Sequence, residues 1–316
     1  MKNNHPDPIE KAWLLTTPFL VLPPVSTLRL TWRFLFFIAY TTLIVAEIRI
    51  RYLLFRFDIR AGMKVRRRWA RNLIRGAGVR GENFGAAPDF PCIVVSNHRS
   101  YLDPILMLRD IDGFPVAKAE LENWPVIGKG AKLAGILYLR REHSGSRINT
   151  LRQIEEKVRE GFPVIIFPEG TTSGLSGTLP FKKGVFQLAA RTGIPIVPVA
   201  LAFRDERDFW VGKEGFMSHA GRRFREKRIF VDVHYGPALR GEDADMLLTE
   251  ARNWIEMRLL QPRKISGRVI GSCFLLFTPF LKALRSCWPT SRWARTSGAR
   301  SVSGNAGPGP CCRISG

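Results

Sequence analysis

Residues 93–104 read IVVSNHRSYLDP, an apolar run followed by a polar loop and a proline. A short apolar run bounded by polar residues is typical of a buried strand. Within the loop, His98 and Asp103 are separated by four residues. Histidine is the side chain best suited to take a proton near neutral pH, and a neighbouring carboxylate can orient it and stabilise its charged form. The stretch therefore predicts a strand that ends at an acid–base pair.

The spacing of His98 and Asp103 limits how the two side chains can meet. In one continuous helix, residues five positions apart point about 140° away from each other. Asp103 precedes Pro104, and proline favours the first turn of a helix, so we expect Asp103 to cap a helix that begins there. His98 then lies in the preceding loop, which can fold back toward Asp103. The alternative is that Asp103 only caps the helix and His98 is an ordinary loop histidine.

A second polar motif, residues 167–173 (FPEGTTS), also follows an apolar run. The run is predicted to be a buried strand that ends at the proline. Gly170 permits a tight turn, and Glu169 and Thr171 present polar groups at the end of the strand. The alternative is an ordinary connection between a strand and a turn.

Two lysines, Lys182 and Lys183, stand before a glycine and a helical pattern of residues. Helix N-termini and cationic side chains both attract anions. The two lysines therefore predict an anion-binding site, and the alternative is a solvated basic loop.

Four blocks of the chain, in order, resemble the glycerolipid acyltransferase family, which includes the 1-acylglycerol-3-phosphate (lysophosphatidic acid) acyltransferases. The blocks are residues 97–103, 135–141 (GILYLRR), 167–171 and 194–199 (IPIVPV). In the second block, Arg141 aligns with the arginine that closes the family's strand. The resemblance covers about residues 90–205, with a weaker continuation to about residue 260.

The resemblance implies an O-acyltransferase in which His98 is the general base and Asp103 orients it. The acyl group would move from the thioester of acyl-CoA or acyl carrier protein to the free hydroxyl of a lysolipid. The leading acceptor is 1-acylglycerol-3-phosphate, which would give phosphatidic acid, and neither a cofactor nor a metal ion is expected. The residues expected to bind substrate are Arg141, Glu169, Gly170, Thr171, Lys182 and Lys183.

One departure from the family pattern concerns the acceptor. Many lysophosphatidic acid acyltransferases continue the third block with an arginine that is expected to help hold the acceptor's phosphate, and Thr172 stands at that position here. Arg141, Lys182 or Lys183 could supply the charge instead. Acyltransferases for lyso-ornithine lipid or other lysophospholipids also resemble this chain and are alternatives. A non-catalytic lipid-binding protein is the alternative outside the enzymes.

The net charge of +22 predicts an anionic partner, either nucleic acid or a membrane. Residues 49–80 hold eleven lysines and arginines and one acidic residue, and they follow an apolar segment of thirteen uncharged residues, 34–46. Nucleic-acid binding alone would not require that apolar neighbour, so we expect an anionic membrane surface and no nucleic acid.

The apolar segment 34–46 is shorter than the roughly 20 residues that a membrane-spanning helix needs. An interfacial helix, a spanning helix and a buried core helix all stay open. Basic residues flank spanning helices on the cytoplasmic side. We therefore expect the protein at the cytoplasmic face of a membrane, and in a bacterium this is the inner membrane. The basic segment 222–228 either joins this membrane-facing or carrier-facing surface or forms a solvated loop.

Apolar runs predict strands at residues 92–96, 136–139, 164–167, 196–200 and 229–234, and helical patterns cover 147–160 and 244–260. This alternation predicts an α/β fold with a largely parallel central sheet flanked by helices, after an N-terminal membrane-associated helical segment. The polar motifs should then lie at the carboxyl ends of strands.

Three regions are expected along the chain. Residues 1–80 form the membrane-associated helical region with its basic cluster, and residues 81–262 form the α/β acyltransferase domain. Residues 263–316 form a basic tail that carries a short apolar segment, 269–281, and ends in a stretch expected to be disordered. Four of the five cysteines lie in this tail, which is not the pattern of a disulfide framework.

Overall fold

The structure is a computed structural model that describes residues 24–54, 58–118, 135–139, 144–212 and 214–260. All of them lie in the first of two compact units, which spans Met1–Pro262. The expected tail segment 269–281 lies outside the described residues.

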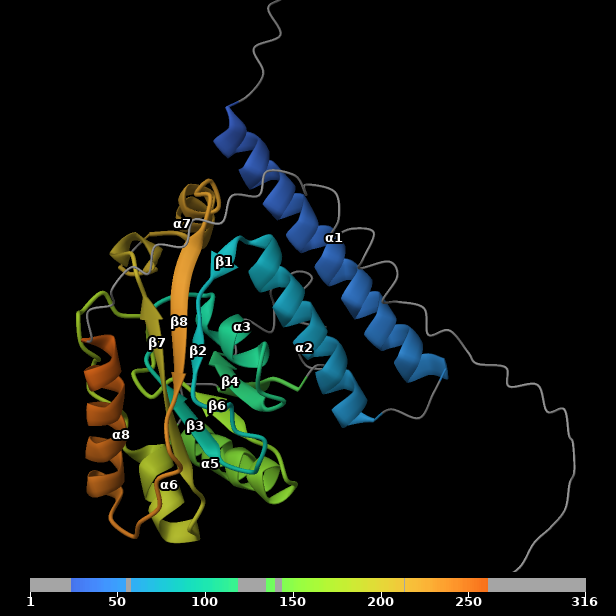
Figure 1. Ribbon diagram of the computed structural model, residues 1–316. Helices are drawn as coiled ribbons and strands as arrows, with labels where there is room; N and C mark the ends of the chain where they lie inside the picture. Colours follow the sequence, from blue (N-terminus) through green and yellow to red (C-terminus); the bar gives the residue numbers. More distant parts are fainter. Residues whose placement is uncertain (1–23, 55–57, 119–134, 140–143, 213, 261–316) are drawn as a thin grey trace, which may run out of the picture. The chain divides into compact units, whose positions relative to one another are not determined.

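A mostly parallel sheet forms the centre of the fold (Figure 1), with strand order β1-β8-β7-β3-β6-β4-β5 and with β2 paired to β8. Six of the strand pairings are parallel, and the pairing of β7 with β8 is antiparallel. The prediction of an α/β fold with a largely parallel sheet is therefore confirmed. The strands are β1 (Val79–Arg80), β2 (Asn83–Phe84), β3 (Ile93–Ser96), β4 (Phe114–Lys118), β5 (Leu137–Leu139), β6 (Val164–Ile166), β7 (Ile196–Phe203) and β8 (Ile229–Tyr235).

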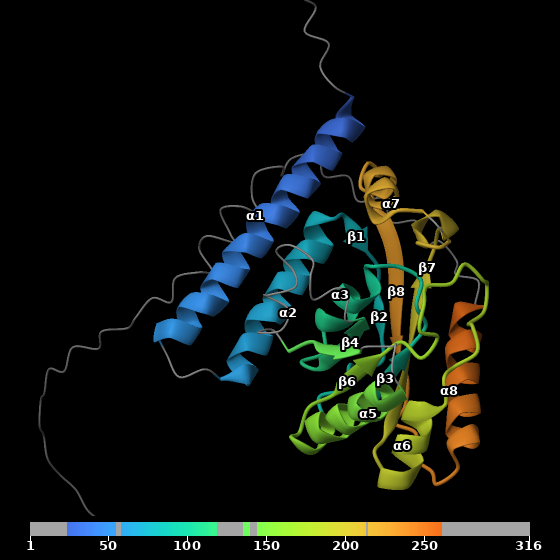
Figure 2. The same ribbon diagram turned by 180° about the vertical axis from the view of Figure 1, so that it is seen from behind.

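Helices cover both faces of the sheet (Figure 2). One face packs against α5, α6 and α8, and the other packs against α2 and α3. The helices are α1 (Val25–Leu54), α2 (Ile59–Gly76), α3 (Asp103–Leu108), α5 (Ser144–Arg159), α6 (Gly184–Thr192), α7 (Phe216–Arg223) and α8 (Ala244–Leu259), with a short 3₁₀ helix at Glu206–Asp208.

Strand β3 shows why its sequence is a continuous apolar run. Ile93 and Val95 belong to the apolar cluster on the α5, α6 and α8 side, whereas Val94 belongs to the cluster on the α2 and α3 side. A strand that is buried on both faces has no need for polar residues at alternate positions. The same burial on both faces applies to Val164 and Ile165 of β6.

The N-terminal apolar segment is part of a longer helix, α1, that packs against α2. Thr41 of α1 accepts a hydrogen bond of 3.1 Å from the Trp69 indole of α2, and Tyr40 accepts one of 2.7 Å from Asn72. Trp69 therefore contacts α1. In the part of the chain that the structure describes, no helix is long and apolar enough to span a membrane.

Arg33 fastens α1 to the turn that follows α7. Its guanidinium donates hydrogen bonds to the backbone carbonyls of Phe224 at 3.0 Å, Glu226 at 2.7 Å and Lys227 at 3.1 Å. The Arg33 side chain is only 7% exposed, and its burial lowers its pKa to about 10. Gly78 has a positive φ of 78°, and a Cβ there would lie 2.0 Å from this guanidinium. The basic segment 222–228 thus serves, at its backbone, as the docking point for α1.

Arg33→Met should detach the first half of α1 without unfolding the sheet. Three part-buried carbonyls would lose their donor, and because water can reach them in part, each should cost less than the roughly 1–3 kcal/mol of a fully buried acceptor. We expect a lower thermal midpoint and faster hydrogen–deuterium exchange across α1.

Arg29→Met is the matched control for Arg33→Met, because Arg29 makes one exposed hydrogen bond to the carbonyl of Arg225. Its effect on the free energy of unfolding should stay within about 0.5 kcal/mol. Equal effects of the two changes would contradict the role given to Arg33.

Candidate active site

The two polar motifs meet because the strands that precede them are neighbours in the sheet. β3 pairs in parallel with β6, and Val95 lies opposite Ile166. Both chains therefore leave the sheet at the same edge, as expected for motifs at the carboxyl ends of strands. The backbone N–H of His98 donates a 2.8 Å hydrogen bond to Glu169 Oε1 across this edge.

The expected contact between His98 and Asp103 is present, with 2.8 Å between His98 Nδ1 and Asp103 Oδ2. Asp103 is fully buried, and its Oδ2 also accepts the backbone N–H groups of Arg99 at 2.6 Å and Ser100 at 2.8 Å. The imidazole is 21% exposed and stacks on the Phe167 ring. The carboxylate can thus orient the ring while Nε2 stays on the side away from Asp103.

One detail of the sequence prediction for Asp103 is wrong. The helix begins at Asp103 itself, and the preceding cap residue is Leu102, whose side chain makes no capping bond. The Asp103 side chain turns back to the loop, because Oδ2 accepts His98 and two backbone N–H groups there. The proline does mark the start of the helix, as expected.

Arg99, to which sequence reasoning gave no role, lies at the centre of the site. Its buried guanidinium donates to Ser173 O at 2.9 Å and Ser173 Oγ at 3.0 Å, and it also donates to the carbonyl of Gly177. Burial lowers the pKa of Arg99, and the carboxylates of Glu169 and Asp103 oppose that shift. A charged residue between two loop residues gives no sequence signal of burial, because its partners are carbonyls far along the chain.

Glu169 is only 5% exposed, and both of its oxygens have protein partners. Oε1 accepts the N–H of His98, and Oε2 accepts the N–H of Leu179, each at 2.8 Å. Burial raises the pKa of Glu169, while these two N–H groups and Arg99 oppose the shift. The polar group expected at the end of the strand is present, and it faces the protein backbone.

Four of the remaining predicted residues border a cavity that His98 also lines. Gly170, which makes the expected turn at a φ of 76°, lines this cavity together with Thr171, Lys182 and Lys183. Lys183 also forms an exposed 2.8 Å ion pair with Asp245 of α8. Arg141 lies outside the described residues. Among the residues that the structure does describe, no group of three or more His, Cys, Asp or Glu side chains could hold a metal ion.

The cavity has a volume of about 1060 Å³ and is mostly apolar. It reaches from His98 to the inner side of α1 and α2. The side chains that line it on that side include Phe37, Ile44, Trp69, Leu73 and Ile105. An apolar cavity that meets a few polar groups at one point is the usual form of a small-molecule site.

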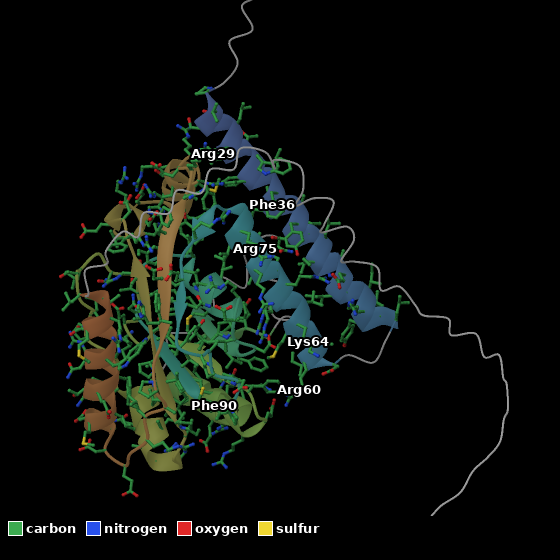
Figure 3. The ribbon with its side chains drawn as sticks, viewed as in Figure 1. Arg29, Phe36, Arg60, Lys64, Arg75 and Phe90 are labelled. Carbon is green, nitrogen blue, oxygen red and sulfur yellow. The ribbon has the colours of Figure 1, made fainter. Side chains whose placement is uncertain are left out.

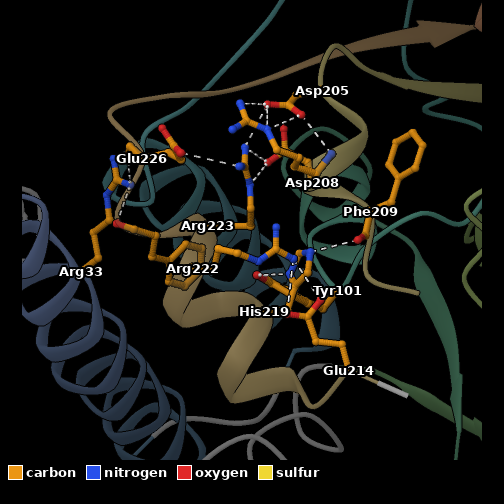
Figure 4. Close-up of polar contacts among 12 residues, drawn as sticks. Arg33, Tyr101, Asp205, Asp208, Phe209, Glu214, His219, Arg222, Arg223 and Glu226 are labelled. Carbon is orange, nitrogen blue, oxygen red and sulfur yellow. Dashed lines mark hydrogen bonds and ion pairs between the residues drawn. The ribbon is translucent and has the colours of Figure 1, made fainter. Parts of the chain in front are cut away.

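Tyr101 forms a wall of the cavity and is held from behind by α7 (Figure 4). The Nδ1 of buried His219 lies 3.3 Å from the Tyr101 hydroxyl, and its Nε2 lies 2.9 Å from the carbonyl of Phe209. Arg223 of the same helix forms a buried 2.7 Å ion pair with Asp208, whose pKa burial raises to about 6. The wall is therefore fixed by polar contacts that lie outside the cavity.

Comparison with known proteins shows similarity to one family. The family model described as Acyltransferase matches residues 78–202. A chloroplastic 1-acyl-sn-glycerol-3-phosphate acyltransferase of Brassica napus is 36% identical over 168 residues, which are 53% of this chain and 46% of the relative. The alpha 1-acyl-sn-glycerol-3-phosphate acyltransferase of Homo sapiens is 36% identical over 143 residues, 43% of this chain and 50% of the relative.

A lyso-ornithine lipid O-acyltransferase of Pseudomonas aeruginosa is 32% identical over 154 residues, 47% of this chain and 59% of the relative. The chain spans about half the length of the curated relatives it matches. The crystal structure of the 1-acyl-sn-glycerophosphate acyltransferase PlsC of Thermotoga maritima is similar with a TM-score of 0.61 at 21% identity. That similarity covers 75% of this chain and 97% of the other, and at this identity it supports the fold.

Two replacements of Asp103 should distinguish the contribution of its charge to stability from the contribution of its hydrogen bonds. In Asp103→Asn the amide oxygen can still accept at the Oδ2 position, so we expect a thermal midpoint close to that of the native protein. In Asp103→Ala two buried N–H groups lose their acceptor, and each costs about 1–3 kcal/mol. Urea unfolding measures the difference, and equal stability of the two variants would contradict the arrangement described.

Proposed function

We propose that the protein is an O-acyltransferase acting on lysolipids, because residues 78–202 match the family model described as Acyltransferase. It transfers a fatty acyl group from the thioester of acyl-CoA or acyl carrier protein to the free hydroxyl of the acceptor. The leading acceptor is 1-acylglycerol-3-phosphate, which gives phosphatidic acid. The observation that carries the proposal is the contact between His98 and Asp103 at the apolar cavity.

The geometry supports a direct attack by the lipid hydroxyl. With Nδ1 bonded to Asp103, His98 can take the hydroxyl proton at Nε2 while the oxygen forms a bond to the thioester carbonyl carbon. When the tetrahedral intermediate collapses, the carbon–sulfur bond breaks, and His98 returns the proton to the leaving thiolate. Asp103 stabilises the imidazolium between the two steps.

The apolar cavity supports a substrate with long hydrocarbon chains. Its lining on the α1 and α2 side is mainly aliphatic and aromatic, with Arg33, Thr41 and Arg66 among it. His98, Thr171 and Lys182 also line the cavity. A fatty acyl chain gains about 0.8 kcal/mol for each methylene that leaves water. The cavity therefore suits an acyl chain whose reactive end lies beside His98.

An acyltransferase for lyso-ornithine lipid or another lysophospholipid is the second candidate. Thr172, which replaces the arginine expected to hold a phosphate, lines the cavity. The similarity to the Pseudomonas aeruginosa lyso-ornithine lipid O-acyltransferase also favours it. A non-catalytic lipid-binding protein is the third candidate, and the intact contact between His98 and Asp103 argues against it.

We propose that the protein lies on an anionic membrane surface, at the cytoplasmic face, through α1. One face of this helix exposes apolar side chains at helical spacing: Leu28, Trp32, Leu35 and Leu43. The neighbouring helix α2 carries exposed cations, among them Lys64 and Arg75 (Figure 3). An exposed apolar face flanked by cations is typical of an interfacial helix.

His98→Ala should abolish acyl transfer and leave the fold intact. We would offer oleoyl-CoA with lysophosphatidic acid, lysophosphatidylcholine and lyso-ornithine lipid in parallel and follow the release of free CoA. The native protein should turn over one acceptor preferentially, and loss of the base should cost at least about 10²–10⁴-fold. Thermal unfolding of the variant is the control. Full activity of His98→Ala would exclude the mechanism, and no turnover with acyl-CoA or acyl carrier protein would favour lipid binding alone.

Replacement of Lys182 and Lys183 together by methionine should raise the KM for an anionic acceptor and leave kcat nearly unchanged. Both residues line the cavity, and their ammonium groups would attract a phosphate. Asp245→Asn is the matched control, because it breaks the ion pair of Lys183 and keeps both lysines. An unchanged KM in the double variant would remove the two lysines from the acceptor site.

A further inference from the structure

We infer that Glu169 is a positioning residue that fixes the backbone of His98, and that it does not bind the acceptor. The inference rests on the proposed function, in which His98 is the general base. It assigns to Glu169 a role that differs from the substrate contact expected from the sequence.

The Glu169 carboxylate is turned away from the cavity. Its chain neighbours Pro168 and Gly170 line the cavity, whereas Glu169 is not among the lining residues. The side chain is 5% exposed, and both oxygens accept backbone N–H groups at 2.8 Å. A bound acceptor would therefore meet the residues on either side of Glu169 and not its carboxylate.

Two carboxylates together set the backbone of the loop that carries the base. Glu169 accepts the N–H of His98, and Asp103 accepts the next two N–H groups, those of Arg99 and Ser100. The carbonyl of His98 accepts the N–H of Ser173 at 3.0 Å, so both peptide groups of this residue are held. Asp103 orients the ring, and Glu169 fixes the peptide from which the ring projects.

The second oxygen of Glu169 extends this attachment to the segment 173–179. Oε2 holds the N–H of Leu179 at the end of the segment, and Arg99 holds the carbonyls of Ser173 and Gly177. This segment lies between Thr172 and Lys182 in the chain, and both of these residues border the cavity. Glu169 thus fixes the base relative to the residues expected to hold the acceptor.

Glu169→Gln tests this role with little change in size. A carboxamide offers one acceptor oxygen and places an NH₂ donor against the other backbone N–H, so one of the two attachments is lost. A misplacement of about 1 Å at a catalytic group can cost roughly 10²-fold in rate. We expect kcat to fall by about that factor, with the KM for lysophosphatidic acid within about twofold of the native value. Glu169→Asp, which keeps the charge but is too short to reach both N–H groups, should show the same pattern.

Glu256→Leu, which removes the acceptor at nearly constant size, is the control. Glu256 Oε1 accepts the backbone N–H of Thr178 at 3.2 Å and its hydroxyl at 2.7 Å, so it holds the same segment from α8 without contacting His98. This variant should lower the thermal midpoint slightly and keep the native kcat. If it lowered kcat as much as Glu169→Gln does, the effect would be general loosening of the segment, and the inference would fail.

Hydrogen–deuterium exchange gives a readout that does not depend on turnover. The amide of His98 should exchange faster in Glu169→Gln than in the native protein and should be unchanged in Glu256→Leu. Unchanged exchange at this amide, or a tenfold rise in KM with native kcat, would overturn the positioning role. Absence of acyltransferase activity in the native protein would contradict the proposed function. The exchange measurement would still decide whether Glu169 fixes the backbone of His98.

Discussion

The parallel pairing of β3 with β6 is the constraint on which the rest of the site depends. Val94 lies opposite Ile165 and Val95 opposite Ile166, so the two chains leave the sheet side by side. His98 and Glu169 are 71 residues apart in sequence and come within hydrogen-bond distance for this reason. A slip of one residue in this register would turn every side chain of the strand to the opposite face of the sheet. The apolar packing on both faces therefore also fixes the geometry of the polar site.

Three charged residues of the site point away from the mostly apolar cavity and into the protein. Asp103, Arg99 and Glu169 are all buried, and their hydrogen bonds go mainly to backbone groups of neighbouring loops. A buried charge is costly unless such bonds compensate it, so these residues stabilise one arrangement of the loops and disfavour others. His98 lies at the boundary, with its ring between Asp103 and the cavity.

The sequence predicted those elements whose burial produces a run of apolar residues. All five predicted strands exist, and the contact between His98 and Asp103 follows from a loop that precedes a proline-marked helix. β4 was missed because it begins with Phe114 and Pro115 and offers little alternation. The antiparallel pairing of β7 with β8 was not predicted, because an apolar run indicates a buried strand but not the direction of its neighbour.

Buried polar residues were the hardest to predict. Nothing in the local sequence distinguishes buried Arg33 and Arg99 from the many exposed arginines, because their acceptors are carbonyl groups of distant segments. For Glu169 the sequence predicted a polar group at the end of the strand, and the residue lies there. The direction of its carboxylate depends on Leu179 and His98, which only the tertiary structure brings together.

The attachment of Arg33 has a consequence for how the chain is synthesised. Its three acceptors lie 191 to 194 residues further along. At translation rates of about 5–20 residues per second, roughly 10–40 s separate the emergence of α1 from that of the turn that fastens it. Helix α2 follows α1 directly, so the two-helix hairpin can form early in this interval. On the ribosome, therefore, both helices have emerged long before the last strand of the sheet that they will cover.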